Sequence, residues 1–393
     1  PGGLRDPGFE RLLSRIDGGG AVHRGNDLWL YCDGEETMQA MIDEVGRAER
    51  EVLVEAYIFT DDETGRRFFA ALRDARRRGV EVKVLADAFG SFRTREAFWR
   101  EMRDEGIEVR LFHRLFPRLW WHPFRDHRKV LAVDRRVAFT GGMNIANEYA
   151  HFTRSGRKLP LNAMRDTHIR IEGPAAWEMV AVFAEGWERA EGTPLPLVDP
   201  PAGPPADGER EGARVLVLES RPGRGHRETA AALSAIVAAA RETVWITNGY
   251  FAPGRQAVAI LGHAARRGLD VRLLLPGRTD VPLVRHAGHG WYSRLLRKGV
   301  RIWEYQAAVL HAKTVVADRY VSVVGSTNLD FRSFRFNSEC NAVVLDDRLG
   351  QTLASTFEGD VAQSEEMLLL PWRRRGVLHK AGDRLAGTLT PLL

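Results

Sequence analysis

The sequence carries one polar pattern twice, and this repeat constrains the fold more than any other feature of the chain. "HRKVLAVD" occupies residues 127–134 and "HAKTVVAD" occupies residues 311–318, so His, Lys and Asp recur with identical spacing. The agreement continues downstream, because "GGMN" ends at Asn144 and "GSTN" ends at Asn328, again 184 residues apart. One such pattern arises readily by chance, whereas two copies in register indicate a duplicated structural unit.

The sequence around the two motifs is repeated as well. "VLVEAYIF" at 52–59 and "VWITNGYF" at 244–251 have the composition of buried strands. Each is followed by a helical segment with a basic end and a capping glycine, Gly79 in the first half and Gly268 in the second. Strands that alternate with helices of ten or more residues predict βαβ units. We therefore predict an α/β fold of two α/β/α layered domains related by a pseudo-twofold axis, with mixed, mainly parallel sheets.

Composition sets the domain boundaries and the class of partner. The 393 residues are 44% hydrophobic and 28% charged, which suffices for two domains with buried cores. A stretch rich in Pro, Gly and charge predicts a first domain at 1–195, a linker at 196–212, and a second domain with a C-terminal tail at 213–393. The net charge of +5 and the pI near 9.4 favour anionic partners, either phospholipid surfaces or nucleic acid.

Several simple classes of protein are excluded by the sequence. Cys32 and Cys340 lie too far apart in sequence to suggest a disulfide framework or a zinc cluster, and we interpret both as reduced packing residues. The longest apolar run, "AAALSAIVAAA" at 230–240, is too short to span a bilayer and fits a buried helix. The chain opens on Pro1 and not on Met, so a tag remnant or a missing N-terminal segment is one interpretation of its start.

The motif residues suit an anion better than a metal. Four apolar residues between Lys and Asp fit a buried strand, and on a strand His127 and Lys129 point to the same face. An imidazole beside an ammonium group, followed by an Asn and by turn amides, matches a phosphate. Two imidazoles facing each other across phosphorus can divide the work, one as nucleophile and the other as general acid and then base. No metal or cofactor is required.

Each candidate residue then receives a role. The catalytic candidates are the motif pairs His127 and Lys129, and His311 and Lys313, with a carboxylate to fix each imidazole tautomer from Asp166 and Glu339. The phosphate oxygens are assigned to the lysines and to Asn144, Ser326 and Asn328. The motif aspartates Asp134 and Asp318 end their strands, so we expect them to cap or pair within the scaffold.

These residues resemble a known family. The paired HxKxxxxD motifs, "GSTN" and the "NSE" triplet at 337–339 are similar to the phospholipase D superfamily. Within it, "YIFTDDETG", "RDTHIRIEGPA", "LLLPGRTDVPLVRHAG" and "GSTNLDFRSFRFNSE" most resemble bacterial cardiolipin synthases. The resemblance implies a covalent phosphohistidine intermediate and phosphatidyl transfer to an alcohol. It also implies that His127 is the nucleophile and His311 the general acid and then base, although the near symmetry of the halves leaves this order open.

Two departures from the family pattern stand out. The first half has Gly142 where the second has Ser326, so the hydroxyl is present once and the half-sites are not equivalent. Many members have Asn before the first motif histidine, whereas this chain has Asp126. That extra carboxylate either tunes His127 or pairs with a neighbouring arginine, Arg125 or Arg128.

An aromatic and basic insertion precedes the first motif. The segment "HRLFPRLWWHPFR" at 113–125 has the composition of a sequence that settles among lipid headgroups. Our candidates for membrane contact are its large aromatic residues, Phe116, Trp120, Trp121 and Phe124. The alternative is a packed loop that covers the end of the sheet.

Other segments are less specific. The tail at 368–393 fits an interfacial anchor, a helix docked on the second domain, or a segment that packs on a neighbouring protomer. The basic loop at 151–163 is a candidate for headgroup contact. The remaining histidines without a partner pattern are interpreted as ordinary surface or core residues: His113, His122, His168 and His263.

The sequence thus predicts a peripheral phosphatidyltransferase of cardiolipin synthase type, on the cytoplasmic side of a bacterial cytoplasmic membrane. It would join two phosphatidylglycerol molecules into cardiolipin and release glycerol. Its expected partners are anionic phospholipids and the membrane surface, with no nucleic acid, and its oligomeric state stays open. The alternatives are a phospholipase D that releases phosphatidic acid, a nuclease of the same superfamily, and a noncatalytic lipid-binding module.

Overall fold

The computed structural model describes residues 2–16, 21–112, 124–153, 159–197, 212–222 and 226–388. The first half contains α1 (Pro7–Ile16), β1 (His23–Tyr31), α2 (Gly34–Arg47), β2 (Glu51–Ala56), α3 (Glu63–Arg77), β3 (Glu81–Asp87), α4 (Glu96–Asp104), β4 (Glu108–Phe112), β5 (Arg125–Asp126), β6 (Val130–Val133), β7 (Val137–Gly141), α5 (Asn147–Ala150), β8 (Met164–Arg165), β9 (His168–Glu172) and α6 (Ala175–Arg189).

The second half follows the same plan. It contains β10 (Ala213–Ser220), α7 (His226–Ala239), β11 (Thr243–Asn248), α8 (Arg255–Arg266), β12 (Asp270–Pro276), α9 (Pro282–Leu296), β13 (Arg301–Tyr305), β14 (Val309–Leu310), β15 (Lys313–Ala317), β16 (Val321–Gly325), β17 (Asn337–Leu345), α10 (Asp347–Val361), β18 (Ser364–Glu366), α11 (Leu369–Arg374) and α12 (Val377–Thr388). Gly79 and Gly268 end α3 and α8 with φ of +94° and +96°, which confirms the predicted glycine caps.

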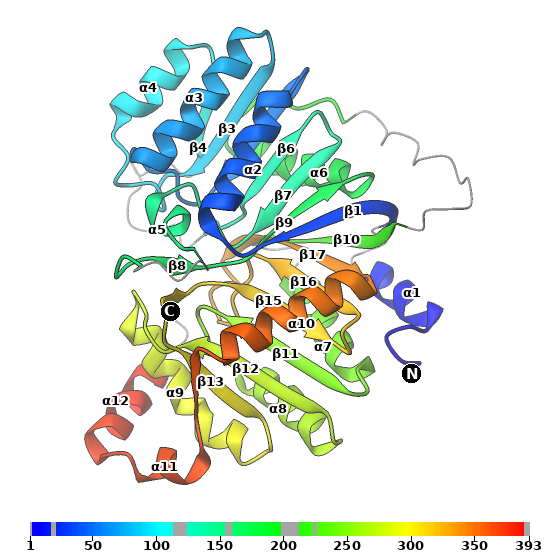
Figure 1. The fold of residues 1–393 in the computed structure, drawn as a ribbon, viewed down its shortest axis with the longest axis vertical. Coiled ribbons are helices and arrows are strands. Elements are labelled where there is room, and N and C mark those ends of the chain that lie inside the picture. Colours follow the sequence, from blue (N-terminus) through cyan, green and yellow to red (C-terminus); the bar gives the residue numbers. More distant parts are fainter. Residues whose placement is uncertain are drawn as a thin grey trace.

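The two halves share one sheet (Figure 1). At its centre β1 pairs with β10 in antiparallel orientation. From β1 the order runs outward through β9, β7, β6, β2, β3 and β4, and from β10 it runs through β17, β16, β15, β11, β12 and β13. Corresponding strands therefore occupy corresponding places on either side of the central pair. This arrangement confirms the mixed α/β class and the twofold relation of the halves.

The expected predominance of parallel strands was wrong. Within the part of the chain that the structure describes, the strands joined by helical crossovers run parallel, namely β2 to β4 and β11 to β13. The other parallel pairs there are the short ones, β5 with β17 and β8 with β14. The inner strands of both halves pair in antiparallel orientation. The alternation of strand and helix in the sequence ends at β4 and β13, because the motif strands that follow are joined by tight turns and not by helices.

The motif aspartates make those tight turns. Asp134 and Arg135 connect β6 to β7 with φ of +52° and +58°, and Asp318 and Arg319 connect β15 to β16 with φ of +49° and +50°. Two consecutive positive φ values are the geometry of a type I′ hairpin turn, in which Asp is tolerated. Asp134 also accepts the backbone N–H groups of residues 49–51, as Asp318 does those of residues 241–243. Their described contacts therefore belong to the scaffold.

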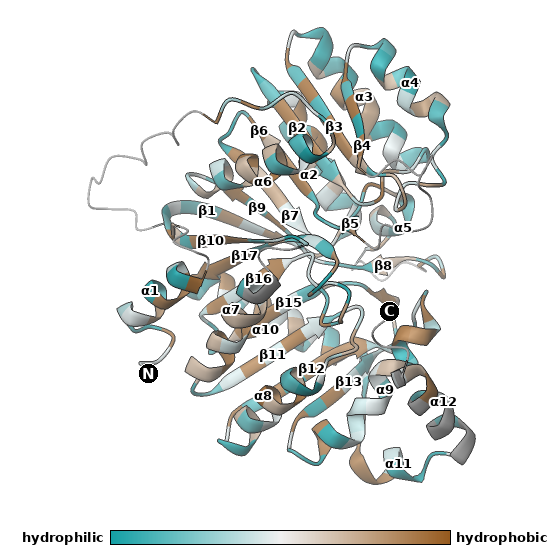
Figure 2. Cartoon of the chain, turned by 180° about the vertical axis from the view of Figure 1, so that it is seen from behind, coloured by the Kyte–Doolittle hydropathy of each residue, from teal (hydrophilic) through white to brown (hydrophobic). Residues whose placement is uncertain are grey.

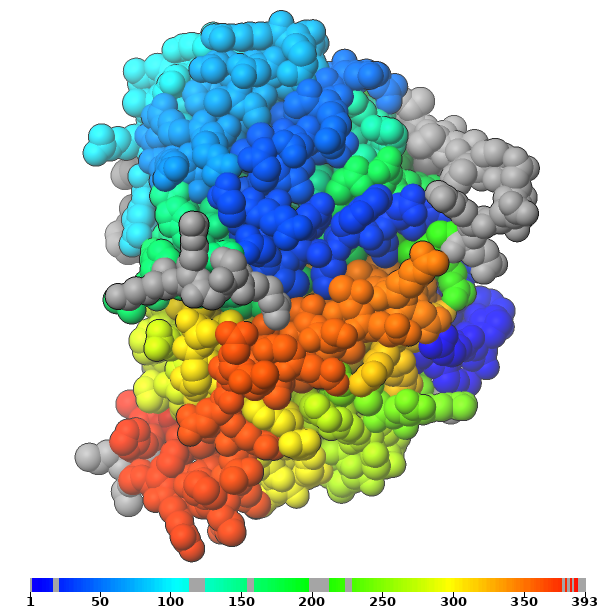
Figure 3. All heavy atoms as spheres, viewed as in Figure 1, coloured from blue at the N-terminus to red at the C-terminus, as the bar shows by residue number. Residues whose placement is uncertain are grey.

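Helices cover the sheet and join the halves. Hydrophobic residues, coloured brown, recur along the strands of the sheet (Figure 2). One cluster of buried residues is continuous across both halves and includes Phe183 of α6 and Phe357 of α10. In the space-filling view the orange surface of α10 meets the blue surface around β1 along the junction (Figure 3). The first helix, α1, packs against α7 of the second half.

The structure tests the prediction for the C-terminal tail, whereas most of the predicted linker lies outside the described residues. The described part of the tail forms α11 and α12, and α12 packs on α9, so the docked helix is the correct reading of residues 369–388 (Figure 1). Residues 154–158 of the basic loop also lie outside the described residues. Within the described ranges, no helix is both long and apolar enough to cross a bilayer.

Candidate active site

Short strands bring each motif histidine to the opposite half. His127 follows β5, which pairs with β17, and His311 follows β14, which pairs with β8. The backbone N–H of His127 donates to the carbonyl of Ser338 at 2.9 Å, and that of His311 donates to the carbonyl of Arg165 at 2.8 Å. Ser338 directly precedes Glu339 in the sequence, and Arg165 directly precedes Asp166. These backbone bonds therefore hold each histidine beside the acidic residue that the sequence suggested.

Each histidine is paired with an acidic residue from the other half of the chain. His127 Nδ1 lies 2.9 Å from Glu339 Oε2, and His311 Nδ1 lies 2.6 Å from Asp166 Oδ2. Both carboxylates are fully buried. Since a carboxylate accepts and does not donate, Nδ1 carries the proton in the neutral ring of His127. Asp166 favours the same tautomer for His311, against Lys313, whose Nζ lies 2.7 Å from His311 Nδ1. Nε2 of each imidazole is then the nitrogen with a lone pair available for chemistry.

Both imidazoles are held neutral. Burial lowers the pKa of His127 to about 4, although Glu339 opposes the shift, and Lys129 adds to it. Burial also lowers the pKa of His311, and the nearby ammonium group of Lys313 lowers it further. A neutral imidazole at neutral pH is the form that attacks phosphorus.

The motif lysines lie close behind the histidines. Lys129 Nζ donates to the carbonyl of His127 at 2.6 Å, and Lys313 donates to the carbonyl of His311. Burial lowers the pKa of Lys129 to about 7 and that of Lys313 to about 8, with Glu339 opposing the shift at Lys129 and Asp166 opposing it at Lys313. Lys313 also lowers the pKa of Lys129, so the cationic groups of the two motifs share one site.

The two carboxylates are charged. Burial alone would raise the pKa of Asp166, but Lys313 and His311 outweigh it and hold the pKa far below its usual range. Burial would likewise raise the pKa of Glu339, and His127 and Lys129 lower it. Ionised acids beside neutral imidazoles fix the tautomer and can stabilise an imidazolium ion when it forms.

Ser326 and Gly142 explain why the half-sites differ. The hydroxyl of Ser326 donates to Glu339 Oε2 at 2.5 Å and accepts the N–H of Cys340 at 3.0 Å. A Cβ at Gly142 would lie 2.1 Å from Asp166 Oδ1, so no side chain fits there. Asp166 Oδ1 instead accepts the N–H of Thr167 at 2.7 Å. Ser326 is thus committed to positioning Glu339, a contact that sequence reasoning did not foresee.

The two motif asparagines have different surroundings. Asn144 Oδ1 accepts the N–H of Ile58 at 3.0 Å, and its Nδ2 donates to the hydroxyl of Tyr149 at 2.7 Å. Asn328 is buried, and its Oδ1 has no hydrogen-bond partner within the part of the chain that the structure describes. This unpartnered atom is an acceptor, so it cannot bind a phosphate oxygen, and only the Nδ2 group of Asn328 can donate to one.

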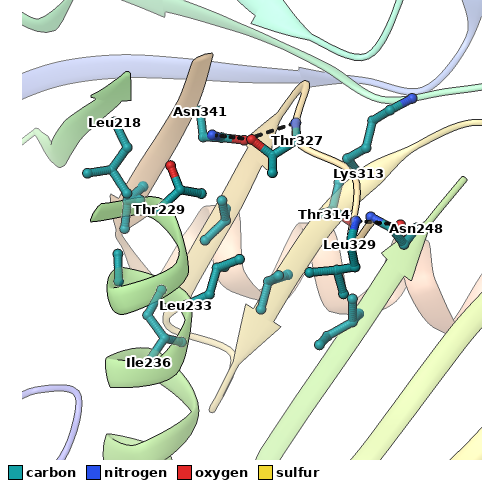
Figure 4. Close-up of a pocket in the computed structure, with 15 residues that line it drawn as sticks. Leu218, Thr229, Leu233, Ile236, Asn248, Lys313, Thr314, Thr327, Leu329 and Asn341 are labelled. Atoms are coloured by element: carbon teal, nitrogen blue, oxygen red, sulfur yellow. Dashed lines mark hydrogen bonds between the residues drawn. The ribbon is translucent and has the colours of Figure 1, made fainter. Parts of the chain in front are cut away.

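The loop that carries Asn328 is fastened from below. Figure 4 looks into a largely apolar cavity between α7 and the sheet, with Lys313 and Asn248 in its lining. Asn248 Oδ1 accepts the N–H of Leu329 at 3.0 Å, and Asn341 Nδ2 donates to Thr327 Oγ1 at 2.7 Å (Figure 4). These bonds lie on either side of Asn328 and hold its backbone in place.

Three tyrosines complete the site and were missed from the sequence. The Tyr57 ring lies 4.9 Å from the His127 ring, and the Tyr149 and Tyr250 rings each lie 5.4 Å from the His311 ring, centroid to centroid. Tyr57 is the sixth residue of "VLVEAYIF" and Tyr250 is the seventh of "VWITNGYF", so the two tyrosines do not occupy equivalent positions and the repeat gave no signal for either. Tyr149 has no counterpart in the repeat, and only the fold reveals it.

Asp126 pairs with an arginine and does not contact His127 through its side chain. Its Oδ1 accepts from Arg128 Nε at 3.0 Å. The guanidinium of Arg128 is 0% exposed and also lies 3.0 Å from carboxylates of Glu55, Glu185 and Glu219. Because Glu219 belongs to β10, this buried network ties the two halves together beside the site.

The remaining candidates are placed only in part. Phe116, Trp120 and Trp121, together with His113 and His122, lie outside the described residues. Phe124 is half-buried, and its ring lies 6.1 Å from that of Phe336. His168 is buried and His263 is exposed. Cys340 is buried and contacts Met179 through sulfur, as a packing residue does.

Two histidines, each held by an acid from the other half and backed by a lysine on a duplicated sheet, define the chain as a protein of phospholipase D type. A family model described as "Cardiolipin synthase, PLD-like domain" matches residues 41–154 and 233–361. These segments contain both motifs and Glu339, while Asp166 lies between them. The chain belongs to this family of cardiolipin synthases with PLD-like domains.

Curated relatives and a solved structure agree. Cardiolipin synthase A of Pseudomonas aeruginosa is 36% identical over 372 residues, 94% of this chain and 74% of that protein. Cardiolipin synthase 2 of Bacillus anthracis is 31% identical over 395 residues, 99% of this chain and 76% of that protein. The crystal structure of phosphatidylserine synthase from Haemophilus influenzae Rd KW20 has a TM-score of 0.72 at 14% identity, covering 98% of each chain, so it shares the fold.

Proposed function

We propose that this protein is a cardiolipin synthase that transfers a phosphatidyl group from one phosphatidylglycerol to a hydroxyl of another. The observation that carries the proposal is the reciprocal pairing of His127 with Glu339 and of His311 with Asp166. It supplies two neutral imidazoles with Nε2 available, beside two lysines. The relatives named cardiolipin synthase, which match along nearly the whole chain, support the choice of substrate class.

The first step forms a phosphohistidine. His127 Nε2 attacks phosphorus, the bond from phosphorus to the headgroup glycerol oxygen breaks, and that oxygen takes a proton from Nε2 of protonated His311. The substrate diester carries a negative charge, which raises the pKa of His311 on binding and favours this protonated form. Lys129 and Lys313, with the Nδ2 group of Asn328, stabilise the charge on the nonbridging oxygens.

The second step reverses these roles. The terminal hydroxyl of a second phosphatidylglycerol gives its proton to His311 Nε2 and attacks phosphorus, and the bond to His127 breaks. The products are cardiolipin and the free imidazole, with glycerol already released. Water in place of the lipid hydroxyl would give phosphatidic acid, so the site must favour the alcohol. The rings of Tyr57, Tyr149 and Tyr250 around the histidines provide apolar surface for that purpose.

We place the protein at a membrane surface, on the cytoplasmic side of a bacterial cytoplasmic membrane. Both substrates and the product are anionic phospholipids, which the net charge of +5 favours. Phe124 and its aromatic neighbours in the insertion are the candidates for contact with the bilayer.

The test is a product assay. Purified protein is incubated with headgroup-labelled phosphatidylglycerol in mixed micelles, and the lipids and glycerol are quantified by mass spectrometry. We expect equal amounts of cardiolipin and glycerol, lost in His127→Ala and His311→Ala and retained in the exposed control His263→Asn. Phosphatidic acid as the sole lipid product would replace the proposal with a phospholipase D, and no histidine-dependent lipid turnover would reject a lipid substrate.

A further inference from the structure

A second cluster of potential ligands lies away from the motif residues. His286 and His289 are three residues apart on α9, and Asp383 faces them from α12. The ligand atoms of the three side chains lie within 4.8 Å of one another. Asp383 Oδ1 is 2.9 Å from His286 Nδ1 and 3.6 Å from His289 Nδ1. Both imidazoles thus present the same nitrogen to one carboxylate oxygen.

The neighbouring residues hold this cluster as metal ligands are usually held. The other nitrogen of His289, Nε2, lies 2.9 Å from Glu304 Oε1. A histidine that binds a metal through one nitrogen commonly donates the other N–H to a carboxylate, which fixes its tautomer and orientation. Arg375 Nη2 donates to Asp383 Oδ2 at 3.0 Å, so Oδ1 remains directed at the histidines.

The spacing and the donor set suit a small divalent ion. Around zinc at about 2.0–2.2 Å in tetrahedral geometry, the ligand atoms lie roughly 3.3–3.5 Å apart. The distances of 2.9 and 3.6 Å to Asp383 Oδ1 bracket that value. Two imidazole nitrogens and one carboxylate oxygen are ligands that zinc accepts readily. The side chain of His286 is 43% exposed, which gives an ion a route in and leaves a fourth position for water.

We propose that His286, His289 and Asp383 bind a divalent transition metal ion, best matched by zinc, which fastens the C-terminal helix α12 to α9. The two helices lie side by side at the far end of the second half (Figure 1). Trp372 of α11 packs on the same cluster, with its ring 5.0 Å from that of His289. The ion would therefore hold the C-terminal helix α12 against α9 of the second half. This role does not depend on the proposed function.

The proposed metal site of His286, His289 and Asp383, called the clamp below, is connected to the active site through α9. That helix begins two residues after Asp280, whose carboxylate accepts the hydroxyl of Tyr250 at 2.8 Å. The Tyr250 ring in turn packs against His311. The ion takes no part in the reaction at the motif histidines. Its removal loosens α12 first and reaches the tyrosine only through the helix.

Metal binding is tested directly on the full chain without a polyhistidine tag. The protein is treated with chelator, desalted, and titrated with Co²⁺ by visible absorption and with Zn²⁺ by competition, and bound metal is counted by elemental analysis. We expect one ion per chain. Glu304→Gln should weaken binding by about 10–100-fold, and His286→Asn by more, because it removes a ligand and not a supporting residue. The control His263→Asn, an exposed histidine on α8, should bind as the wild type does.

Hydrogen exchange gives an independent readout of the clamp. We expect Zn²⁺ to slow amide exchange in α12 of the wild type and of His263→Asn, and to leave His286→Asn unchanged. Since His286 is on the surface, this variant should retain the thermal unfolding of the metal-free protein. Absence of saturable binding, or equal affinity in His286→Asn and the wild type, would overturn the proposal and leave an ordinary histidine–aspartate hydrogen bond.

Discussion

Replacing Glu339 by Gln tests whether the acid from the second half controls the histidine of the first. Glu339 is fully buried and contacts His127 Nδ1, Ser326 Oγ and Asn337 Nδ2. Gln has nearly the same shape, so the packing is retained while the negative charge is lost. The amide can also present N–H to the ring, which allows the wrong imidazole tautomer.

The expected loss lies in the chemical step. Replacing the carboxylate behind a catalytic histidine by an amide costs about 10⁴ in kcat in the best-studied hydrolases. Glu339 has Ser326 and Asn337 as partners that help to hold a Gln in place, so we expect a loss of about 10²–10⁴. This corresponds to about 3–5 kcal/mol of transition-state stabilisation. At a pH low enough to keep Lys129 protonated in the variant, KM should change little, because the substrate phosphate is held by the lysines and not by Glu339.

The pH profile separates this role from a structural one. The pKa of Lys129 is about 7, and Glu339 raises it against the effect of burial. Removing the charge therefore lowers that pKa, and Lys129 loses its proton at lower pH. The alkaline limb of kcat/KM, expected between pH 7 and 8 in the wild type from Lys129 and Lys313, should move to lower pH in Glu339→Gln.

A double mutant completes this test. Glu339→Gln combined with His127→Ala should be no slower than His127→Ala alone, since Glu339 acts through that ring. The reasoning is refuted if Glu339→Gln keeps the wild-type kcat, or if its loss adds fully to that of His127→Ala. Thermal unfolding of each variant identifies any loss that comes from misfolding.

Three further perturbations follow from the site. The first uses a p-nitrophenyl ester of phosphatidic acid, whose leaving group needs no proton. With this substrate, His311→Ala should release a burst of nitrophenol and stop at the phosphohistidine, whereas His127→Ala should give no burst. The reverse result would make His311 the nucleophile. Gly142→Ser should lower both activity and melting temperature, because its Cβ would lie 2.1 Å from Asp166, and unchanged thermal unfolding would contradict this packing. Arg128→Ala should cost about 3–5 kcal/mol in urea unfolding, because it leaves four carboxylates around a buried gap, and a loss below about 1 kcal/mol would contradict the network.

Stability should also depend on pH through the buried motif groups. The folded pKa of His127 is about 4 and the ordinary value is 6.5, so the unfolded chain binds its proton first as pH falls. The stability from burying the neutral ring is complete above about pH 6.5 and is lost as pH falls toward 4. His127→Gln should therefore show a smaller loss of melting temperature between pH 7 and pH 5 than the wild type, and equal losses would contradict the assignment.

The sequence determined the repeat and what the repeat implies. Local patterns are sufficient for this, because a buried strand, a glycine cap and a motif of fixed spacing are written in consecutive residues. The outer βαβ units, the caps at Gly79 and Gly268 and the identity of the motif histidines and lysines all came from such patterns. The same local reading failed at the motif hairpins, where alternation of strand and helix stops and the sheet becomes antiparallel.

Only the tertiary structure decided which residues face one another. Asp166 and Glu339 stood out as candidate acids, yet the exchange between halves depends on β5 pairing with β17 and β14 with β8, contacts that join residues 145 and 212 positions apart. The partner of Asp126, the commitment of Ser326 to Glu339, Tyr149 and the cluster at Asp383 are of the same kind. Such contacts carry no periodic signal, because they are set by how two folded halves meet and not by the sequence on either side.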